Sequence, residues 1–226
     1  MVRTFAILPV KRFEEAKQRL RGTLPSSGRR ALVRAMVHDV LDALDRVRGV
    51  HRLVVVTAEE SVRALAAARG DAVIDDNVEA GQSAAAALGI ARAQRAGAER
   101  VLLVPGDCPA LWPQEVDAML RRHERGPGVV LVPDRHGTGT NALLLAPPDA
   151  IAPSFGEGSR RRHLRIALEA GITPAVEPLV SLGLDVDTAD DLETLEVALE
   201  RIPESFARHT RDALADLRRL PAIGGR

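Results

Sequence analysis

The chain has 226 residues, 46% of them hydrophobic and 27% charged, a composition that predicts one α/β-sized domain with a single sizeable core. Lys plus Arg equals Asp plus Glu at 31 each and aromatic residues make up 2%, so nucleic acid and anionic membranes are not expected partners. With Cys108 as the sole cysteine, no signal-peptide pattern and no apolar run of roughly 20 residues, we expect a cytoplasmic protein without intrachain disulfides.

Strands and helices alternate through the first half of the chain. Short apolar runs typical of strands that are covered on both faces occur at residues 4–10, 53–57, 72–74 and 100–104. Apolar residues recur at helical spacing between them, at residues 32–44, 59–69 and 83–95. This alternation predicts a three-layer α/β domain, in which ligands bind beyond the carboxyl ends of the strands.

The second half departs from this rhythm. A helix is expected from Pro113, and the strands predicted at 129–133 and 142–146 flank a glycine-containing segment, which suggests a hairpin. A cationic helix is expected at 159–170, a strand at 182–186, and a helix through Leu199 that begins with a capping box of Thr188 and Asp191. Pro203 is expected to open a final helix to about residue 220, a C-terminal extension of the single 1–226 domain that could serve a homodimer.

The two lysines are the sharpest compositional signal. All other cationic residues are arginine, yet Lys11 and Lys17 lie within seven residues of each other, just after the first predicted strand. Lysine differs from arginine mainly as a compact point charge suited to phosphate. We therefore favour a polyphosphate contact over a chance pair on a solvated loop.

Aspartates follow two of the predicted strands. Asp107 ends the strand at 100–104, and Asp185 and Asp187 alternate near the end of the strand at 182–186. Two carboxylates from separate strands, completed by phosphate oxygens and water, suit Mg²⁺. The alternative is that these are loop and helix-cap aspartates, since Asp187 precedes a helix.

Two further segments are rich in hydrogen-bond donors. Residues 135–141 contain Arg135, His136, Thr140 and Asn141 together with two glycines, a composition that favours an anion-binding loop over a plain turn. Residues 156–159 place glycines and Ser159 at the start of the cationic helix, where free backbone N–H groups attract anions. A solvated basic face would explain the arginines of that helix equally well, and His163 could be a packed helix residue.

Several of these strings together resemble one family. They are Ile7-Leu8-Pro9-Val10-Lys11, Ala16-Lys17-Gln18-Arg19-Leu20, Pro105-Gly106-Asp107-Cys108-Pro109, Pro133 through Asn141, Phe155 through Ser159, and Leu184-Asp185-Val186-Asp187-Thr188. In this order, from about Thr4 to Leu195, they look like the 2-phospholactate/phosphoenolpyruvate guanylyltransferases of the CofC type, which serve coenzyme F-420 biosynthesis. The resemblance implies a Rossmann-like nucleotidyltransferase fold similar to glycosyltransferase A, with a mixed, mostly parallel sheet.

The resemblance also assigns expected roles residue by residue. Asp107 and Asp187 match metal-binding aspartates, with Asp185 as a further candidate, and Lys17 joins them as a catalytic residue. Thr140, Gly156 and Ser159 match positions associated with the phosphorylated acid. GTP is expected at Leu8, Pro9, Val10, Lys11, Lys17, Gly81 and Ser83. In two places the chain departs from the family: Gly81-Gln82-Ser83 stands where Gly-Leu-Asn is frequent, and Arg160 replaces a usual phenylalanine.

The expected activity is Mg²⁺-dependent transfer of GMP from GTP to the phosphate of phosphoenolpyruvate or 2-phospholactate, with release of pyrophosphate. Phosphoenolpyruvate, 2-phospholactate and 3-phosphoglycerate differ too little for the sequence to choose among them. The arginine- and alanine-rich composition is typical of a GC-rich bacterium, and on that basis we favour phosphoenolpyruvate. Two alternatives stay open at this point. One is another enzyme of the same fold, such as a molybdenum-cofactor or sugar-phosphate nucleotidyltransferase or a glycosyltransferase, and the other is a non-catalytic GTP-binding relative.

Overall fold

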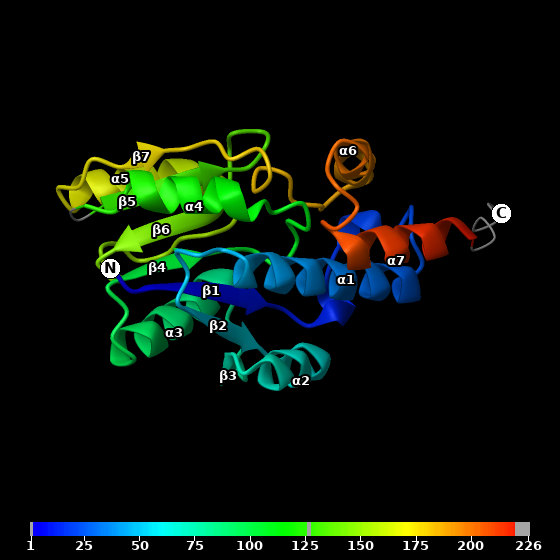
Figure 1. The fold of residues 1–226 in the computed structure, drawn as a ribbon, viewed down its shortest axis with the longest axis horizontal. Helices are drawn as coiled ribbons and strands as arrows, with labels where there is room; N and C mark the ends of the chain where they lie inside the picture. The colour runs from blue at the N-terminus through cyan, green and yellow to red at the C-terminus, as the bar shows by residue number, and fades with distance from the viewer. Residues whose placement is uncertain (1, 126–127, 220–226) are drawn as a thin grey trace.

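One seven-stranded sheet forms the middle of the molecule in the computed structural model, which describes residues 2–125 and 128–219 (Figure 1). In spatial order its strands are β3 (Ala72–Asp75), β2 (Arg52–Thr57), β1 (Thr4–Val10), β4 (Arg100–Leu103), β6 (Thr140–Ala146), β5 (Gly128–Pro133) and β7 (Ala175–Val176). The strands β1 to β4 pair in parallel, whereas β6 runs antiparallel to both of its neighbours. The predicted mixed, mostly parallel sheet and the β5–β6 hairpin are thereby confirmed.

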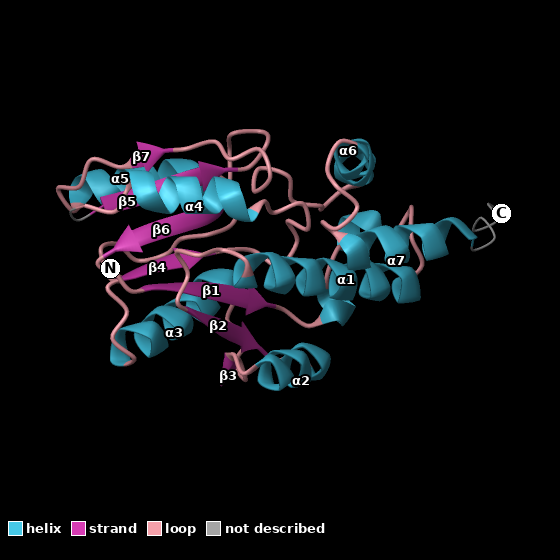
Figure 2. Cartoon of the chain, in the orientation of Figure 1, coloured by secondary structure: helices cyan, strands magenta, loops and turns pink. Residues whose placement is uncertain are grey.

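Helices cover both faces of this sheet, which gives the three predicted layers (Figure 2). Two clusters of buried hydrophobic residues pack between the helices and the sheet, and the side chains of β1 alternate between the two. Ala6 and Leu8 belong to one cluster, and Phe5 and Ile7 to the other. The first cluster includes residues of α1 (Ser26–Asp45), α2 (Glu60–Arg69), α4 (Pro113–Arg122), α6 (Ala189–Glu200) and α7 (Arg208–Arg219). The second includes residues of α3 (Gln82–Arg95) and α5 (Ser159–Glu169). None of the helices in the described ranges is long and apolar enough to span a bilayer.

The all-parallel β1–β4 half explains the unbroken apolar runs of the sequence. All seven residues of β1 but Pro9 are buried, as are all four of β4, because helices lie on both sides of these strands. The two strands run in parallel, so the loops that follow them leave the sheet at the same edge. Topology therefore gathers residues from far-apart segments at this edge.

Two expectations about elements were wrong, and three short elements were not predicted. Residues 182–186 form no strand, although Leu182, Leu184 and Val186 are buried. The segment begins in a turn, where Gly183 N–H donates to the Leu179 carbonyl at 2.8 Å, and further on Val186 N–H donates to the Asp107 carbonyl at 3.2 Å. The last helix begins at Arg208, because residues from Pro203 form a turn first, and residue 220 lies outside the described part of the chain. The loop after β1 contains two short 3₁₀ turns, η1 (Phe13–Glu15) and η2 (Gln18–Leu20), and β7 was not predicted at all.

Candidate active site

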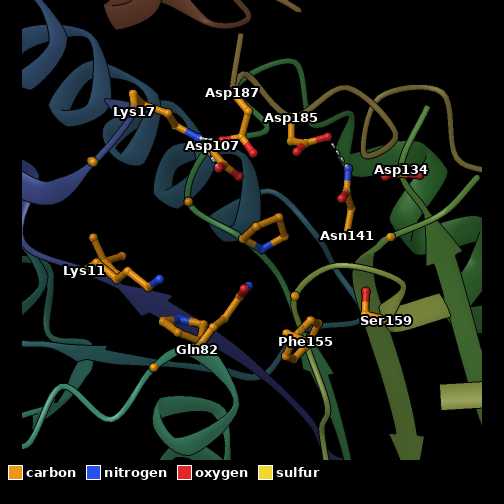
Figure 3. A pocket seen from close by; sticks show the side chains of 18 of the residues that line it. Lys11, Lys17, Gln82, Asp107, Asp134, Asn141, Phe155, Ser159, Asp185 and Asp187 are labelled. Atoms are coloured by element: carbon orange, nitrogen blue, oxygen red, sulfur yellow. Dashed lines mark hydrogen bonds and ion pairs between the residues drawn. The ribbon is translucent and has the colours of Figure 1, made fainter. Parts of the chain in front are cut away.

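A cavity of about 670 Å³ opens at the carboxyl ends of β1 and β4, within the size range of small-molecule sites. It is bounded by the loop after β1, the start of α3, the loop after β4, the β5–β6 turn, the start of α5 and the segment before α6. Figure 3 shows three groups of side chains around it. Lys17 lies along one side with Asp107, Asp185 and Asp187, Lys11 and Gln82 lie along another, and Ser159 and Phe155 along a third. Segments singled out in the sequence thus contribute to one space.

Lys17 lies between two carboxylates. Its backbone has a φ of 53°, a left-handed conformation that is uncommon for a residue with a side chain, and it sits between η1 and η2. The side chain is 7% exposed, and its Nζ donates to Asp107 and, at 2.7 Å, to Asp187 Oδ1. Burial opposes the ammonium charge, but the two carboxylates outweigh burial and raise the Lys17 pKa above its usual value. Lys17 is therefore a fixed positive charge inside the cavity.

Three aspartates line the cavity beside this lysine: Asp107, Asp185 and Asp187. Asp107 Oδ1 is buried and has no hydrogen-bond partner among residues 2–125 and 128–219. Burial, and after it the charge of Asp107, raises the pKa of Asp185 to about 6. Asn141 Nδ2 donates to Asp185 Oδ1 at 3.0 Å and so fixes that carboxylate (Figure 3). This cluster has an excess of negative charge, which Lys17 offsets only in part.

The donor chemistry of these aspartates decides whether they could hold a metal ion. Within residues 2–125 and 128–219 no group of three or more His, Cys, Asp or Glu side chains is arranged as a ready metal site. The donors are nevertheless all carboxylate oxygens, and the buried Asp107 Oδ1 lacks a partner. Mg²⁺ commonly uses only one or two protein carboxylates and takes its other ligands from phosphates and water. The residues present therefore fit a divalent ion that arrives with a nucleotide.

The β5–β6 turn and the start of α5 form the donor-rich wall of the cavity. Asp134 accepts from Thr138 N–H at 2.8 Å and packs so tightly that a Cβ at Gly139 would stand 2.8 Å from its Oδ2. Thr140 N–H then donates to Ser159 Oγ at 2.9 Å, which ties the turn to α5. Gly156 and Gly158 adopt positive φ angles before the helix. Thr140, Gly156 and Ser159 consequently face one space, as their shared expected role requires.

The residues expected at GTP divide into two groups. Pro9, Val10, Lys11 and Gly81 line the cavity, and Lys11 is exposed. Leu8 and Ser83 do not line it: Leu8 is 0% exposed in the core, and Ser83 Oγ accepts from Phe155 N–H at 2.9 Å. Ser83 therefore fixes the backbone of the segment before α5, and the Leu8 side chain packs in the buried cluster on one face of the sheet.

The residues of the anion-binding loop predicted at 135–141, which we expected to bind the phosphorylated acid, divide in the same way. His136 and Asn141 line the cavity, but Arg135 does not. The Arg135 guanidinium pairs with Asp190 and Asp191 at the start of α6, and its Nε lies 2.8 Å from Asp191 Oδ1. Because those two acidic residues already engage it, Arg135 fastens the turn to α6.

Two residues that line the cavity, and one that lies behind its wall, were given no role in binding from the sequence. Gln82 lies beside Lys11 at the start of α3, and Phe155 faces the cavity next to Ser159 (Figure 3). His163, which the sequence left as a possible packed residue, is fully buried behind Thr140. The signal for Gln82 was present, since it lies in the segment that departs from the family pattern; Phe155 and His163 depend on tertiary contacts that no local pattern reveals.

Comparison with known proteins identifies relatives over nearly the whole chain. The family model described as "Guanylyl transferase CofC like" matches residues 4–209. The phosphoenolpyruvate guanylyltransferase of Conexibacter woesei is 49% identical over 96% of this chain and 97% of its own length. The 2-phospho-L-lactate guanylyltransferase of Methanothermobacter thermautotrophicus is 35% identical (96% and 92% covered). The 3-phospho-D-glycerate guanylyltransferase of Phenylobacterium zucineum is 37% identical (94% and 96% covered).

Solved structures agree on the fold. A 4-diphosphocytidyl-2C-methyl-D-erythritol synthase superposes with a TM-score of 0.63 at 15% identity, covering 88% of this chain and 99% of its own. A nucleotidyl transferase from Methanothermobacter superposes with a TM-score of 0.62 at 19% identity, covering 88% and 98%. The predicted nucleotidyltransferase fold is therefore confirmed.

Proposed function

Since the chain belongs to the CofC-like guanylyltransferase family, we propose that it transfers GMP from GTP to the phosphate of a small phosphorylated acid and releases pyrophosphate. Its place would be the cytoplasmic assembly of coenzyme F-420. The observation that carries this proposal is the convergence of Lys17, Asp107 and Asp187 with Thr140, Gly156 and Ser159 on a single cavity. A nucleotide site and an acid site can thus lie side by side.

The cavity has two chemically different sides. Lys11 and Lys17 come from the loop after β1, where the triphosphate would lie with its negative charge against two cations. Thr140 and Ser159 line another part of the cavity and would supply hydroxyl groups for the carboxylate or phosphate of the acid. Figure 3 shows Ser159 across the cavity from Lys11. This arrangement would bring an acceptor phosphate oxygen to the α-phosphorus of GTP.

The reaction we propose is an in-line displacement. An oxygen of the acceptor phosphate forms a bond to the α-phosphorus, the bond to the bridging α–β oxygen breaks, and pyrophosphate leaves with that electron pair. The acceptor phosphate is already ionised near neutral pH, so the protein does not need a general base. Lys17, held rigidly by Asp107 and Asp187, would stabilise charge that develops on the transferring phosphoryl group.

A magnesium ion would belong to the same centre. Asp107 and Asp187 would hold it, with Asp185 beside them, and the bound ion would neutralise phosphate charge. The support is the all-oxygen donor set and the unpartnered Asp107 Oδ1 described above. Because Lys17 contacts both carboxylates, it would share them with the ion.

We propose phosphoenolpyruvate as the acceptor. The relative at 49% identity carries that substrate in its name, whereas the relatives named for 2-phospho-L-lactate and 3-phospho-D-glycerate are 35% and 37% identical. All three acids present one phosphate and one carboxylate, so the same donor wall would receive any of them. The choice among them rests on the shape of this wall.

Pyrophosphate release from a panel of nucleotides tests the proposal. The purified protein is incubated with Mg²⁺, phosphoenolpyruvate and either GTP, ATP, CTP or UTP, and each reaction is repeated without the acid. We expect release from GTP that requires the acid. Release from another nucleotide in preference to GTP would indicate a different nucleotidyltransferase, and GTP binding without any release would indicate a non-catalytic relative.

A further inference from the structure

His163 lies directly behind the wall that would receive the acid. It is on α5, one turn after Ser159, so the two side chains share a face of the helix. The imidazole is 0% exposed and meets the Phe155 ring edge-on, with centroids 5.2 Å apart. His163 does not line the cavity itself, and it would touch no substrate.

The hydrogen bonds of His163 fix where its ring proton sits. Ser154 N–H lies 2.8 Å from Nε2, and a backbone N–H can only donate, so Nε2 must carry a lone pair. The proton of the neutral ring is therefore on Nδ1, which lies 3.0 Å from Thr140 Oγ1. Burial, followed by the charge of Arg162, lowers the His163 pKa to about 4 and keeps the ring neutral. Nδ1–H consequently donates to the Thr140 hydroxyl.

This donation determines what the Thr140 hydroxyl can offer. A hydroxyl has one proton and two acceptor positions, and His163 occupies an acceptor position of Thr140 Oγ1. Ser159 Oγ is used in the same way, since it accepts from Thr140 N–H at 2.9 Å. Both hydroxyl oxygens thus act as acceptors toward the protein, and their own protons are left for the cavity that they line. Figure 3 shows the Ser159 side chain pointing into it.

We propose that His163 is a positioning residue that turns the Thr140 hydroxyl into an oriented donor for the anionic acceptor. The inference rests on the proposed function, because the anion it serves is the acid of the transfer. An imidazole in the other tautomer would need the Thr140 proton for itself, and the cavity would then face a lone pair that repels a carboxylate or phosphate. The preference of the cavity for an anion is therefore determined by His163, which lies behind Thr140 and does not line the cavity itself.

Two substitutions separate the two nitrogens of His163. His163→Asn places an amide donor near the Nδ1 position, whereas His163→Gln places an amide oxygen near Nε2, where it can accept from Ser154 N–H, and removes the donor to Thr140. We expect His163→Gln to raise KM for phosphoenolpyruvate about tenfold or more, as befits a hydrogen bond to a charged group, with KM for GTP unchanged. We expect His163→Asn to stay within about threefold of the wild type. Arg165→Gln, on the exposed side of the same helix, is the matched control.

A double-variant cycle tests whether His163 acts through Thr140. If it does, Thr140→Val with His163→Gln should be no worse toward phosphoenolpyruvate than Thr140→Val alone. Equal effects of the Asn and Gln variants, a matching rise in KM for GTP, or additive losses in the cycle would overturn the inference while leaving the guanylyl transfer itself intact. A wild-type protein that transfers GMP to none of the acids would instead overturn the proposed function.

A measurement on the wild-type protein covers variants that fail to fold. Nitrogen-15 NMR of the ring nitrogens distinguishes the tautomers, and His163 should keep its proton on Nδ1 between about pH 5 and 8, above its lowered pKa. Phosphoenolpyruvate should shift the Nδ1–H resonance, and GTP alone should not. A proton on Nε2, or titration near the ordinary histidine pKa of about 6.5, would overturn the inference whether or not the enzyme is active.

Discussion

Lys17 combines three features that seldom coincide in one residue. Its backbone is left-handed, its side chain is nearly buried, and its ammonium group contacts two carboxylates from distant parts of the chain. Backbone strain of this kind costs of order 1–3 kcal/mol and persists where the surroundings impose it. In this chain the two ion pairs hold the ammonium group, and with it the position of the charge, in place.

Replacing Lys17 by alanine should lower kcat by about 100-fold or more, the size of loss typical when a preorganised electrostatic contact is removed. The measurement is turnover at saturating GTP and phosphoenolpyruvate, with thermal unfolding as a check that the fold survives. Lys17→Arg is the informative companion, because it keeps the charge but not the compact shape, and it should recover only part of the rate. Wild-type turnover in Lys17→Ala would remove this residue from the mechanism.

His163 should make the protein sensitive to acid. Its pKa is lowered from the usual 6.5 to about 4, so between these values the unfolded chain binds a proton that the folded chain does not. The neutral His163 ring contributes fully to the free energy of unfolding above the unfolded-state pKa of about 6.5. As the pH falls toward 4 this contribution, on the order of 3 kcal/mol, is lost.

Urea unfolding of the wild type and of His163→Asn at a series of pH values isolates this effect, since the variant does not titrate at this position. The difference in free energy of unfolding between the two proteins should change across pH 6.5 to 4, in favour of the variant at low pH. A constant difference would show that the ring is not held neutral.

Among the secondary-structure elements, α7 has its first turn capped by a single carboxylate of α1. Asp39 Oδ1 accepts from His209 N–H at 3.0 Å and its Oδ2 from Thr210 N–H at 2.7 Å, so a side chain of α1 caps the first turn of α7. Burial raises the pKa of Asp39 although these hydrogen bonds act in the opposite direction. The C-terminal extension thus packs on its own chain, and a homodimer through it stays a prediction.

Asp39→Ala should destabilise the protein by about 0.5–2 kcal/mol, the range found for lost helix caps. Asp39→Asn keeps one acceptor oxygen and avoids a buried charge, so it should lose less. Both values come from urea unfolding. Equal stability of the wild type and Asp39→Ala would show that α7 is held by its apolar contacts alone.

Gly89 sets the distance between α3 and the sheet. A Cβ at this position would stand 2.3 Å from Ile7 Cγ2 on β1, so any larger residue must push the helix away. Gly89→Ala should therefore cost about 1–3 kcal/mol through overpacking, although alanine is the better helix former. Gly128→Ala is the control, because its φ is not positive and a Cβ there would meet no atom of the described residues within 4 Å. A stabilised Gly89→Ala variant would contradict the close packing.

The sequence correctly predicted those helices and strands whose apolar residues form long, regular patterns. The strands β1, β2 and β4 and the helices between them follow from apolar runs and helical spacing, and the Thr188–Asp191 capping box is present at α6. The prediction of a strand at 182–186 was wrong, because buried and less buried side chains alternate there without the backbone pairing that defines a strand. The two-residue strand β7 is too short for any period to appear.

For the molecule as a whole, topology brings the site together. Lys17 and Asp187 are 170 residues apart in sequence, and they meet because the loop after β1 and the segment before α6 lie at the same edge of the sheet. Rarity of lysine and the expected placement of aspartates after strands singled these residues out, although the strand expected before Asp187 does not form. The engagement of Arg135 by α6 and the tautomer of His163 could not be predicted, since both depend on partners that only the folded chain supplies.

Mass spectrometry of the product tests the central claim most directly. Wild-type protein is incubated with GTP, Mg²⁺ and phosphoenolpyruvate, 2-phospholactate or 3-phosphoglycerate in turn, with Asp107→Asn as the control for the carboxylate that Lys17 contacts. We expect a covalent adduct of GMP and phosphoenolpyruvate in the wild type, and little or none in the variant. If GTP binds but no acid yields an adduct, the cavity does not perform guanylyl transfer.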